Sequence, residues 1–261
     1  MKNSAPKLRA RLQSGEKLVG SWISMTDPVA AEIMCEIGFD FLMIDAEHGA
    51  LGIETIQQHV MVANLMSVPV LVRIPSNEPV IIKQVLDLGA NGILVPLSAT
   101  ADDVEQAVAA ANYPPAGVRG FGPRRASRYG RLFREYIEVA SENVLVFIQI
   151  EQEEAVRNLD SILKVQGVDA LLIGSNDLSG SIGLLGQPRA PAVLQLIDET
   201  IKKGSEANMP VGAASATDPE SLEDWFNRGA QFVVMGGDIG FIMDAGDAAL
   251  HRAKEQLKKV L

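Results

Sequence analysis

The chain has few of the side chains that form disulfides or thiolate metal sites. Its 261 residues include one cysteine, Cys35, and three histidines. A single cysteine excludes an intramolecular disulfide, and there is no Cys/His cluster of the kind that holds zinc. This usage is compatible with a reducing compartment, so we expect a cytoplasmic protein.

Long apolar runs and excess positive charge are also missing. No apolar run approaches the roughly 18 to 20 residues that a membrane-spanning helix needs. The first 20 residues are charged and lack the apolar core of a signal peptide, so we expect no membrane partner. The net charge is −10 at pH 7, which disfavours nucleic acid as a partner because its phosphate backbone attracts basic surfaces.

Two nucleotide-binding motifs are absent as well. No expected strand is followed by a G-x-G-x-x-G turn into a helix, and the sequence has no P-loop. This absence weakens the main structural rival, an open doubly wound sheet that binds a dinucleotide.

Eight short apolar segments, each followed by a helical pattern, dominate what is present. No shift in composition divides the chain, and 47% of its residues are hydrophobic. The alternation predicts one (β/α)8 TIM barrel over residues 1–261, preceded by a short amphipathic helix within residues 1–17. The expected strands cover residues 19–24, 39–45, 68–74, 93–96, 143–151, 168–174, 211–215 and 232–237.

The second expected strand ends in a cluster of ionisable residues. The apolar run 41–44 is followed by Asp45, Glu47 and His48. In barrels of this kind, chemistry is found at the carboxyl ends of the strands. The cluster therefore indicates a reactive mouth, although the same charges could simply cap the next helix.

Other expected strands also end in polar residues that would converge on the same rim. Glu151 and Asp177 are the best pair of metal ligands, because two carboxylates completed by water and substrate oxygens suit Mg²⁺ or Mn²⁺. Each could instead be a helix N-cap. The backbone amides of the turn Gly174, Ser175, Asn176 and Asp177 could hold a substrate carboxylate.

Arg73 ends the third expected strand. Its guanidinium suits a carboxylate or a developing oxyanion. The alternative is an ion pair with Asp45 or Glu47 that has no role toward substrate.

The ten lysines fall in expected helices, their flanks or the N-terminal tail. An aldolase that forms a Schiff base needs a lysine buried at a strand end. Catalysis through a covalent imine is therefore disfavoured, and a metal ion would have to take the electrophilic role instead.

One connection lacks a clear period. Residues 114–136 are rich in glycine, and five arginines lie between Arg119 and Arg131. Long loops in compact barrels usually serve function or an interface. The sequence favours neither a substrate-covering loop nor a subunit contact.

The sequence resembles the HpcH/HpaI aldolase family, the class II pyruvate aldolases, over nearly the whole chain, including the strand-end residues named above. The matching segments are residues 39–41, 45–49, 72–75, 113–120, 149–151 and 174–179. One departure is Ser175, where many members carry proline.

The resemblance implies a (β/α)8 barrel that assembles as a homo-hexamer. It implies a divalent metal ion, Mg²⁺ or Mn²⁺ with Co²⁺ as a further candidate, bound by Glu151 and Asp177. The implied substrate contacts come from Arg73 and Gln149, from the amides of Asn176 and Asp177, and from Trp22 as a pocket aromatic.

The resemblance also implies a proton-transfer role for His48. Asp87 is the implied orienting partner of His48, within the chain or across a subunit boundary. Asp45 is implied to position Arg73 or a water molecule.

The implied activity is reversible cleavage of a 4-hydroxy-2-oxo acid to pyruvate and an aldehyde. The implied substrates are of the 4-hydroxy-2-oxoheptanedioate or 2-dehydro-3-deoxyglucarate type, from aromatic or sugar-acid catabolism. The sequence does not separate them. The alternatives are a metal-dependent decarboxylase of a β-keto acid such as oxaloacetate, and a non-catalytic barrel that binds keto acids.

Overall fold

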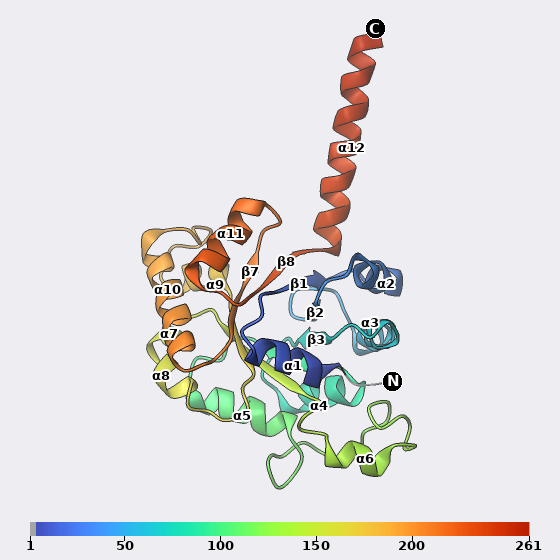
Figure 1. Ribbon diagram of the computed structural model, residues 1–261, viewed down its shortest axis with the longest axis vertical. Coiled ribbons are helices and arrows are strands. Elements are labelled where there is room, and N and C mark those ends of the chain that lie inside the picture. Colours follow the sequence, from blue (N-terminus) through green and yellow to red (C-terminus); the bar gives the residue numbers. More distant parts are fainter. Residues whose placement is uncertain (1–3, 261) are drawn as a thin grey trace.

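Eight parallel strands close into a barrel in the computed structural model, which describes residues 4–260. Each strand pairs with the next, and the last pairs with the first, so the expected barrel is confirmed (Figure 1). The strands are β1 (Leu18–Ile23), β2 (Phe41–Asp45), β3 (Val70–Arg73), β4 (Gly92–Val95), β5 (Leu145–Ile150), β6 (Ala170–Ile173), β7 (Val211–Ser215) and β8 (Phe232–Gly237).

Helices follow the strands around the barrel. They are α1 (Ala5–Gln13), α2 (Pro28–Ile37), α3 (Ile53–Met66), α4 (Pro79–Asp87), α5 (Ala101–Ala111), α6 (Phe133–Glu138), α7 (Glu153–Arg157), α8 (Leu159–Ile162), α9 (Ser175–Ser181), α10 (Pro191–Glu206), α11 (Pro219–Arg228) and α12 (Asp238–Val260). The single helix expected near residues 153–165 is divided into α7 and α8 at Asn158. The side-chain amide of Asn158 donates a hydrogen bond to the carbonyl of Ala99 at 2.9 Å.

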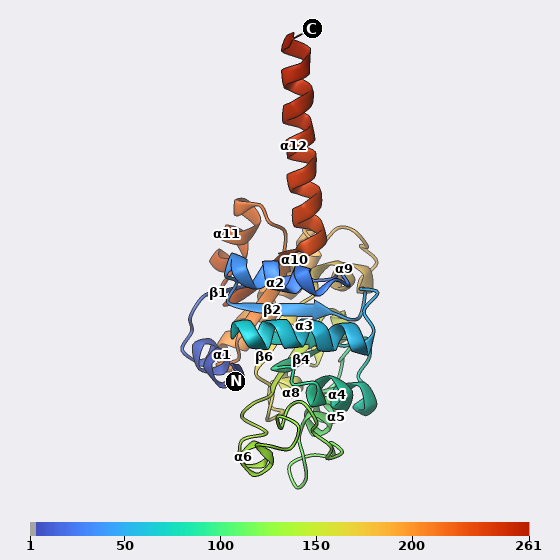
Figure 2. The ribbon, with the colours of Figure 1, turned by 90° about the vertical axis from the view of Figure 1, so that its right-hand side faces the viewer.

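The interior of the barrel is filled by large apolar side chains. The rings of Phe41 and Phe147 each pack against Phe232, with centroid distances of 5.9 Å and 5.5 Å. Helix α1 lies across the end of the barrel where the strands begin (Figure 2), and it contributes buried Leu8 and Leu12 to this cluster. The opposite end is thus left for the site.

Two strand glycines make room for these rings. A Cβ atom at Gly20 would lie 2.5 Å from the ring of Phe41, and one at Gly212 would lie 2.3 Å from the ring of Phe232. Both distances are far inside van der Waals contact, so the filled interior requires glycine at each position.

Gly212→Ala should therefore lower the free energy of unfolding by about 1–3 kcal/mol, the usual cost of overpacking a core. Denaturant titration measures the change. Gly122→Ala is the matched control, because a Cβ there meets nothing within 4 Å. Equal stability of the two variants would show that the barrel interior tolerates an added methyl group.

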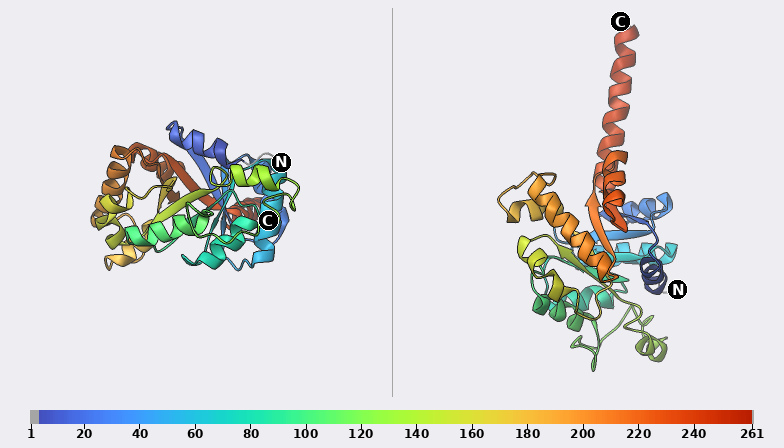
Figure 3. Two further views of the ribbon diagram at one scale, coloured as in Figure 1. Left: turned by 90° about the horizontal axis from the view of Figure 1, so that it is seen from below. Right: turned by 60° about the vertical axis from the view of Figure 1, so that its left-hand side comes forward.

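Helix α12 does not fold back onto the barrel. It projects away from the other elements in Figure 1 and in the right-hand view of Figure 3, and its apolar side chains Ile242, Met243, Leu250 and Leu257 are exposed. In a regular barrel the last helix would lie between α11 and α2. No helix within residues 4–260 is long and apolar enough to cross a membrane.

Helix α2 has an apolar face with no cover from its own chain. Val29, Ile33 and Ile37 recur at every fourth position and are exposed. Helix α2 itself borders the position that α12 would fill if it folded back, because α2 follows β1 and β1 pairs with β8. The chain thus has an unpartnered apolar helix and an uncovered apolar face beside the position left open.

Candidate active site

The ends of β2 and β3 bring an acid and a base together. Asp45 and Arg73 are register partners in the β2–β3 pairing. The Nε and Nη2 atoms of Arg73 donate to the two carboxylate oxygens of Asp45 at 3.0 Å and 2.7 Å. The ring of Trp22, from β1, lies 4.4 Å from the Arg73 guanidinium carbon. Arg73 is therefore held by a fork and a stacking contact.

Asp45 also organises the turn that follows it. Its Oδ1 atom accepts hydrogen bonds from the amides of Glu47 and His48, both at 3.2 Å. Burial alone would raise the pKa of Asp45. The bonds from Arg73, that residue's charge and the two amides together hold the pKa below its usual range. Asp45 is thus an ionised anchor for both the arginine and the turn.

Glu47, for which no separate role is predicted from sequence, lies between Arg73 and His48. Its Oε2 atom is 3.3 Å from Nη1 of Arg73 and 3.8 Å from Nε2 of His48, and it has no hydrogen-bond partner among the described residues. Burial is the main cause of a raised pKa at Glu47. The charge of Arg73 opposes this effect, and that of Glu151 adds to it. His48 is 64% exposed at the rim.

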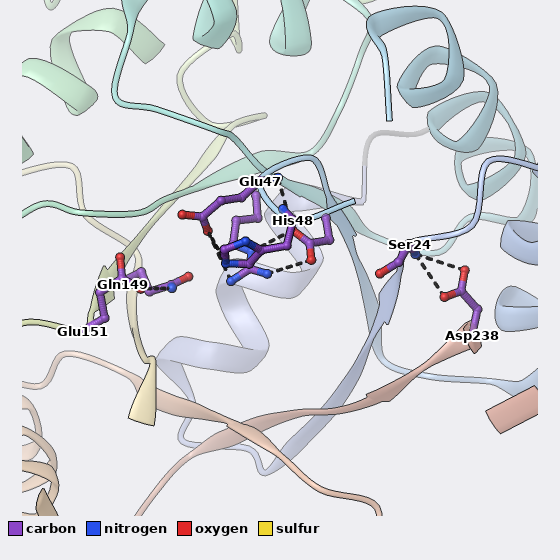
Figure 4. A network of polar contacts seen from close by, with 8 residues as sticks. Ser24, Glu47, His48, Gln149, Glu151 and Asp238 are labelled. Carbon is purple, nitrogen blue, oxygen red and sulfur yellow. Dashed lines mark hydrogen bonds and ion pairs between the residues drawn. The ribbon is translucent and has the colours of Figure 1, made fainter. Parts of the chain in front are cut away.

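Glu151 and Gln149 face this group from β5 and the residue after it (Figure 4). The Glu151 side chain is buried and accepts hydrogen bonds from the amide of Leu97 at 2.7 Å and from the side chain of Gln149. The Oε1 atom of Gln149 is buried without a hydrogen-bond partner. One carboxylate and one unpaired amide oxygen therefore lie side by side.

Asp177 lies close enough to Glu151 for its charge to affect the pKa of that carboxyl group. Burial is the main cause of the raised pKa of Glu151, and the charge of Asp177 contributes to it. Residues 4–260 contain no group of three His, Cys, Asp or Glu residues placed to hold a metal ion. The carboxylates of Glu151 and Asp177 and the free oxygen of Gln149 still form an oxygen donor set of the type that Mg²⁺ and Mn²⁺ prefer.

The turn before α9 lies against these groups. Gly174 is the N-cap of α9, and Ser175 is its first residue. A Cβ at Gly174 would lie 3.0 Å from the Cβ of Glu151 and 3.2 Å from Nε2 of Gln149. Glycine therefore lets this backbone approach the carboxylate closely.

A pocket of about 510 Å³ joins the expected residues. Its lining includes, from the expected set, Trp22, His48, Arg73, Gln149, Gly174, Ser175, Asn176 and Asp177. No lysine of the described chain lines it. Residues at or just after the ends of β2, β3, β5 and β6 thus meet Trp22 in one cavity.

Asp87 is not brought to His48 within the chain. It is the last residue of α4, a helix that starts at the mouth and ends at the opposite end of the barrel. There it accepts a hydrogen bond from Nη2 of buried Arg119 at 2.6 Å. A pairing of Asp87 with His48 across a subunit boundary stays a prediction.

The arginine-rich loop also lies away from its own mouth. It connects the end of α5 to the start of β5, which places it at the same end of the barrel as Asp87. Together with the ends of α3 and α4 it lines a second cavity of about 880 Å³. The loop therefore does not cover the site of its own chain, and a role toward substrate would require a neighbouring copy.

Asp238, another strand-end carboxylate, has a structural role in the chain. It accepts hydrogen bonds from the amides of Ser24 at 3.0 Å and Met25 at 2.9 Å (Figure 4). It also accepts from the amide of Ile239 at 2.9 Å. Asp238 thus fixes the turn after β1 to the start of α12.

Comparison with known proteins places this arrangement in a family. The family model of the HpcH/HpaI aldolase/citrate lyase proteins matches residues 18–245. The chain belongs to that family. Within it, the chain is 37% identical to a 4-hydroxy-2-oxo-heptane-1,7-dioate aldolase of Shigella sonnei, over 100% of this chain and 98% of the relative. It is 34% identical to a 5-keto-4-deoxy-D-glucarate aldolase of Escherichia coli O6:H1, over 92% and 93% of the two chains.

Solved structures agree with the fold of this HpcH/HpaI family member. A family protein from Burkholderia cenocepacia superimposes with a TM-score of 0.91 at 30% identity, covering 97% of this chain and 100% of that one. A citrate synthase superimposes with a TM-score of 0.85 at 29% identity, covering 96% and 98%. The chain is an enzyme of the aldolase type, a carbon–carbon lyase.

The pairing of Asp45 with Arg73 predicts a pH-dependent loss of stability on Asp45→Asn. At pH 7 the variant should be less stable by about 3 kcal/mol, because one partner of a buried ion pair is removed. The folded pKa of Asp45 lies below its unfolded value of about 3.9. Its stabilising effect is therefore present above that value and is lost as the pH falls through the folded pKa.

The difference in unfolding free energy between the wild type and Asp45→Asn should shrink when denaturant titrations are repeated at about pH 3. A difference that is the same at both pH values would mean that the carboxylate charge does not contribute to stability.

Proposed function

We propose that this enzyme cleaves a 4-hydroxy-2-oxo acid, derived from a dicarboxylate or a sugar acid, reversibly to pyruvate and an aldehyde. The observation that carries the proposal is the meeting of an ion-paired Arg73 with Asp177 and Gln149 in one pocket that no lysine of residues 4–260 lines, with the buried carboxylate of Glu151 bonded to Gln149. Both aldolase relatives are named for oxo acids that carry two carboxylates, which is consistent with this substrate class.

We propose Glu151 and Asp177 as the residues that hold a divalent metal ion, Mg²⁺ or Mn²⁺. The fit rests on the buried carboxylate of Glu151, whose pKa is raised by burial and by the charge of nearby Asp177, and on the unpartnered oxygen of Gln149. The ion would supply the positive charge that offsets the negative charge developing on the 2-oxo acid.

Arg73 is the fixed cation of the site. Asp45 and Trp22 hold its guanidinium before any substrate arrives. Its charge is therefore preorganised to stabilise the enolate oxygen that develops when the C3–C4 bond breaks. The Oε2 atom of Glu47 lies 3.3 Å from Nη1 of Arg73 but forms no hydrogen bond with it, so this edge of the guanidinium still has a donor to offer. This edge is the part of the fork that a substrate oxygen can approach.

His48 lies at the rim, where the C4 hydroxyl of the substrate would arrive. Its backbone is held by Asp45, and its ring nitrogen lies 3.8 Å from the carboxylate of Glu47. The imidazole, directly or through a water molecule, takes the hydroxyl proton in cleavage and returns it in condensation. The amides of Asn176 and Asp177, at the start of α9, are proposed to bind the carboxylate next to the ketone.

His48→Ala should lower aldol cleavage by roughly 10²- to 10⁴-fold, the usual contribution of a general base. Decarboxylation of oxaloacetate should fall much less, because loss of CO₂ needs no proton removal from a C4 hydroxyl. Pyruvate release from 4-hydroxy-2-oxoheptanedioate measures the first reaction, and loss of oxaloacetate measures the second.

His251→Ala, on the exposed surface of α12, is the matched control and should leave both rates unchanged. Equal cleavage rates for His48→Ala and the wild type would make His48 structural. A wild type that decarboxylates oxaloacetate but cleaves no 4-hydroxy-2-oxo acid would favour the decarboxylase instead.

We further propose that the enzyme is a homo-oligomer, a hexamer by the family resemblance, in which α12 packs on a second copy. The exposed stripe of α12 and the uncovered face of α2 are complementary apolar surfaces on the same chain. Exchange between two copies covers both surfaces at once, and it fills the position left open between α11 and α2.

Leu250→Glu should therefore reduce the molar mass measured by light scattering, because it places a charge in the apolar stripe of α12. Ala248→Glu adds the same charge on the opposite side of the helix and should keep the mass near six times 28.0 kDa. A wild-type mass near that of one chain would refute the assembly.

A further inference from the structure

The pocket extends beyond the groups that would hold a 2-oxo acid. Arg189, Ser221 and Asp224 also line this pocket, and so do the apolar side chains of Leu194 and Trp225. The lining thus combines a second set of polar groups with apolar side chains, which suits a ligand chain that carries a further polar group.

Arg189 is positioned before any ligand binds. Its Nη2 atom donates to the hydroxyl of Ser221 at 2.9 Å. Ser221 is itself fixed at the start of α11, because its amide donates to the capping carboxylate of Asp218 at 2.8 Å. The guanidinium thus has a defined place on the pocket wall, which reduces the entropy lost when it binds a ligand.

No carboxylate of residues 4–260 accepts a hydrogen bond from Arg189, although two lie nearby. Its Nη1 atom lies 4.0 Å from Oδ2 of Asp224, which is too long for a hydrogen bond. The same oxygen accepts a hydrogen bond from Nε of Arg228 at 3.0 Å. The Arg189 side chain is 66% exposed, whereas that of Arg73 is 12% exposed and bound by two carboxylates. Arg189 therefore retains donors for a ligand in the pocket.

We propose that Arg189 binds a carboxylate at the far end of the aldehyde half, and that it is a specificity-determining residue for acidic aldehydes. The inference rests on the proposed aldol reaction and names the class of its second substrate. A single guanidinium matches one carboxylate through two parallel hydrogen bonds. A doubly charged phosphate would fit less well, because the carboxylates of Asp218 and Asp224 lie close to Arg189.

The test measures kcat/KM for condensation of pyruvate with two aldehydes of similar length, succinic semialdehyde and butanal. Arg189→Gln should lower the value for succinic semialdehyde by roughly 10- to 100-fold, the range expected for one lost hydrogen bond to a charged group. Butanal, which has no terminal charge, should be affected much less. Arg157→Gln, an equal charge change on the exposed surface of α7, should leave both values unchanged.

Exchange of the pyruvate methyl protons with D2O separates this inference from the proposed function. The exchange needs the groups that bind the 2-oxo acid but no aldehyde, so the wild type, Arg189→Gln and Arg157→Gln should exchange equally. Equal exchange also shows that Arg189→Gln is folded. Arg189→Lys keeps the positive charge but loses the forked pair of donors. Its kcat/KM for succinic semialdehyde should lie between those of the wild type and Arg189→Gln.

Three results would overturn the role of Arg189 while leaving the aldolase reaction intact. They are an equal fall for both aldehydes, no fall for succinic semialdehyde, and a wild-type preference for glyceraldehyde 3-phosphate that Arg189→Gln removes. A wild type that exchanges no pyruvate protons would overturn the proposed function, and the role of Arg189 with it.

Discussion

The ion pair between Asp45 and Arg73 is the contact on which the mouth of the barrel depends. It joins the ends of two neighbouring strands, so the barrel register itself sets the distance between the two side chains. The same carboxylate holds the turn that carries His48, and the same guanidinium lies against Trp22. One buried pair therefore orients Arg73, the backbone of His48 and the contact with Trp22.

Most of the fold and the convergence of the site could be predicted from sequence. Apolar runs that end in ionisable residues specify buried parallel strands, and closure of the barrel brings their ends to one rim. This rule locates Asp45, Arg73, Gln149 and Asp177, because the end of a strand can be found in the sequence without knowing which side chains touch. The ion pair that we weighed as an alternative for Arg73 is present, and it orients the fork without saturating it.

Other features required the structure because they depend on packing between distant elements. The apolar pattern of α12 predicts a helix, but not that it leaves the barrel and exposes Leu250. The arginine-rich loop has two interpretations from sequence, and its place at the end opposite the mouth excludes only that it covers the site of its own chain. Glu47 belongs to the cluster that the sequence indicates, but without a role of its own, and Arg189 has no clear signal in sequence because loop arginines are common. Their roles emerge only from the groups around them.

Exchange of pyruvate methyl protons, combined with borohydride trapping, tests the central claim that fixed charge and a carboxylate-bound metal ion do the chemistry. The enzyme is incubated with pyruvate in D2O, with Mn²⁺, after EDTA treatment, and after Mn²⁺ is restored. The account predicts exchange that stops with EDTA and resumes with Mn²⁺, and a protein mass that borohydride leaves unchanged. Exchange that persists in EDTA, together with a covalent pyruvate adduct in the mass spectrum, would contradict it.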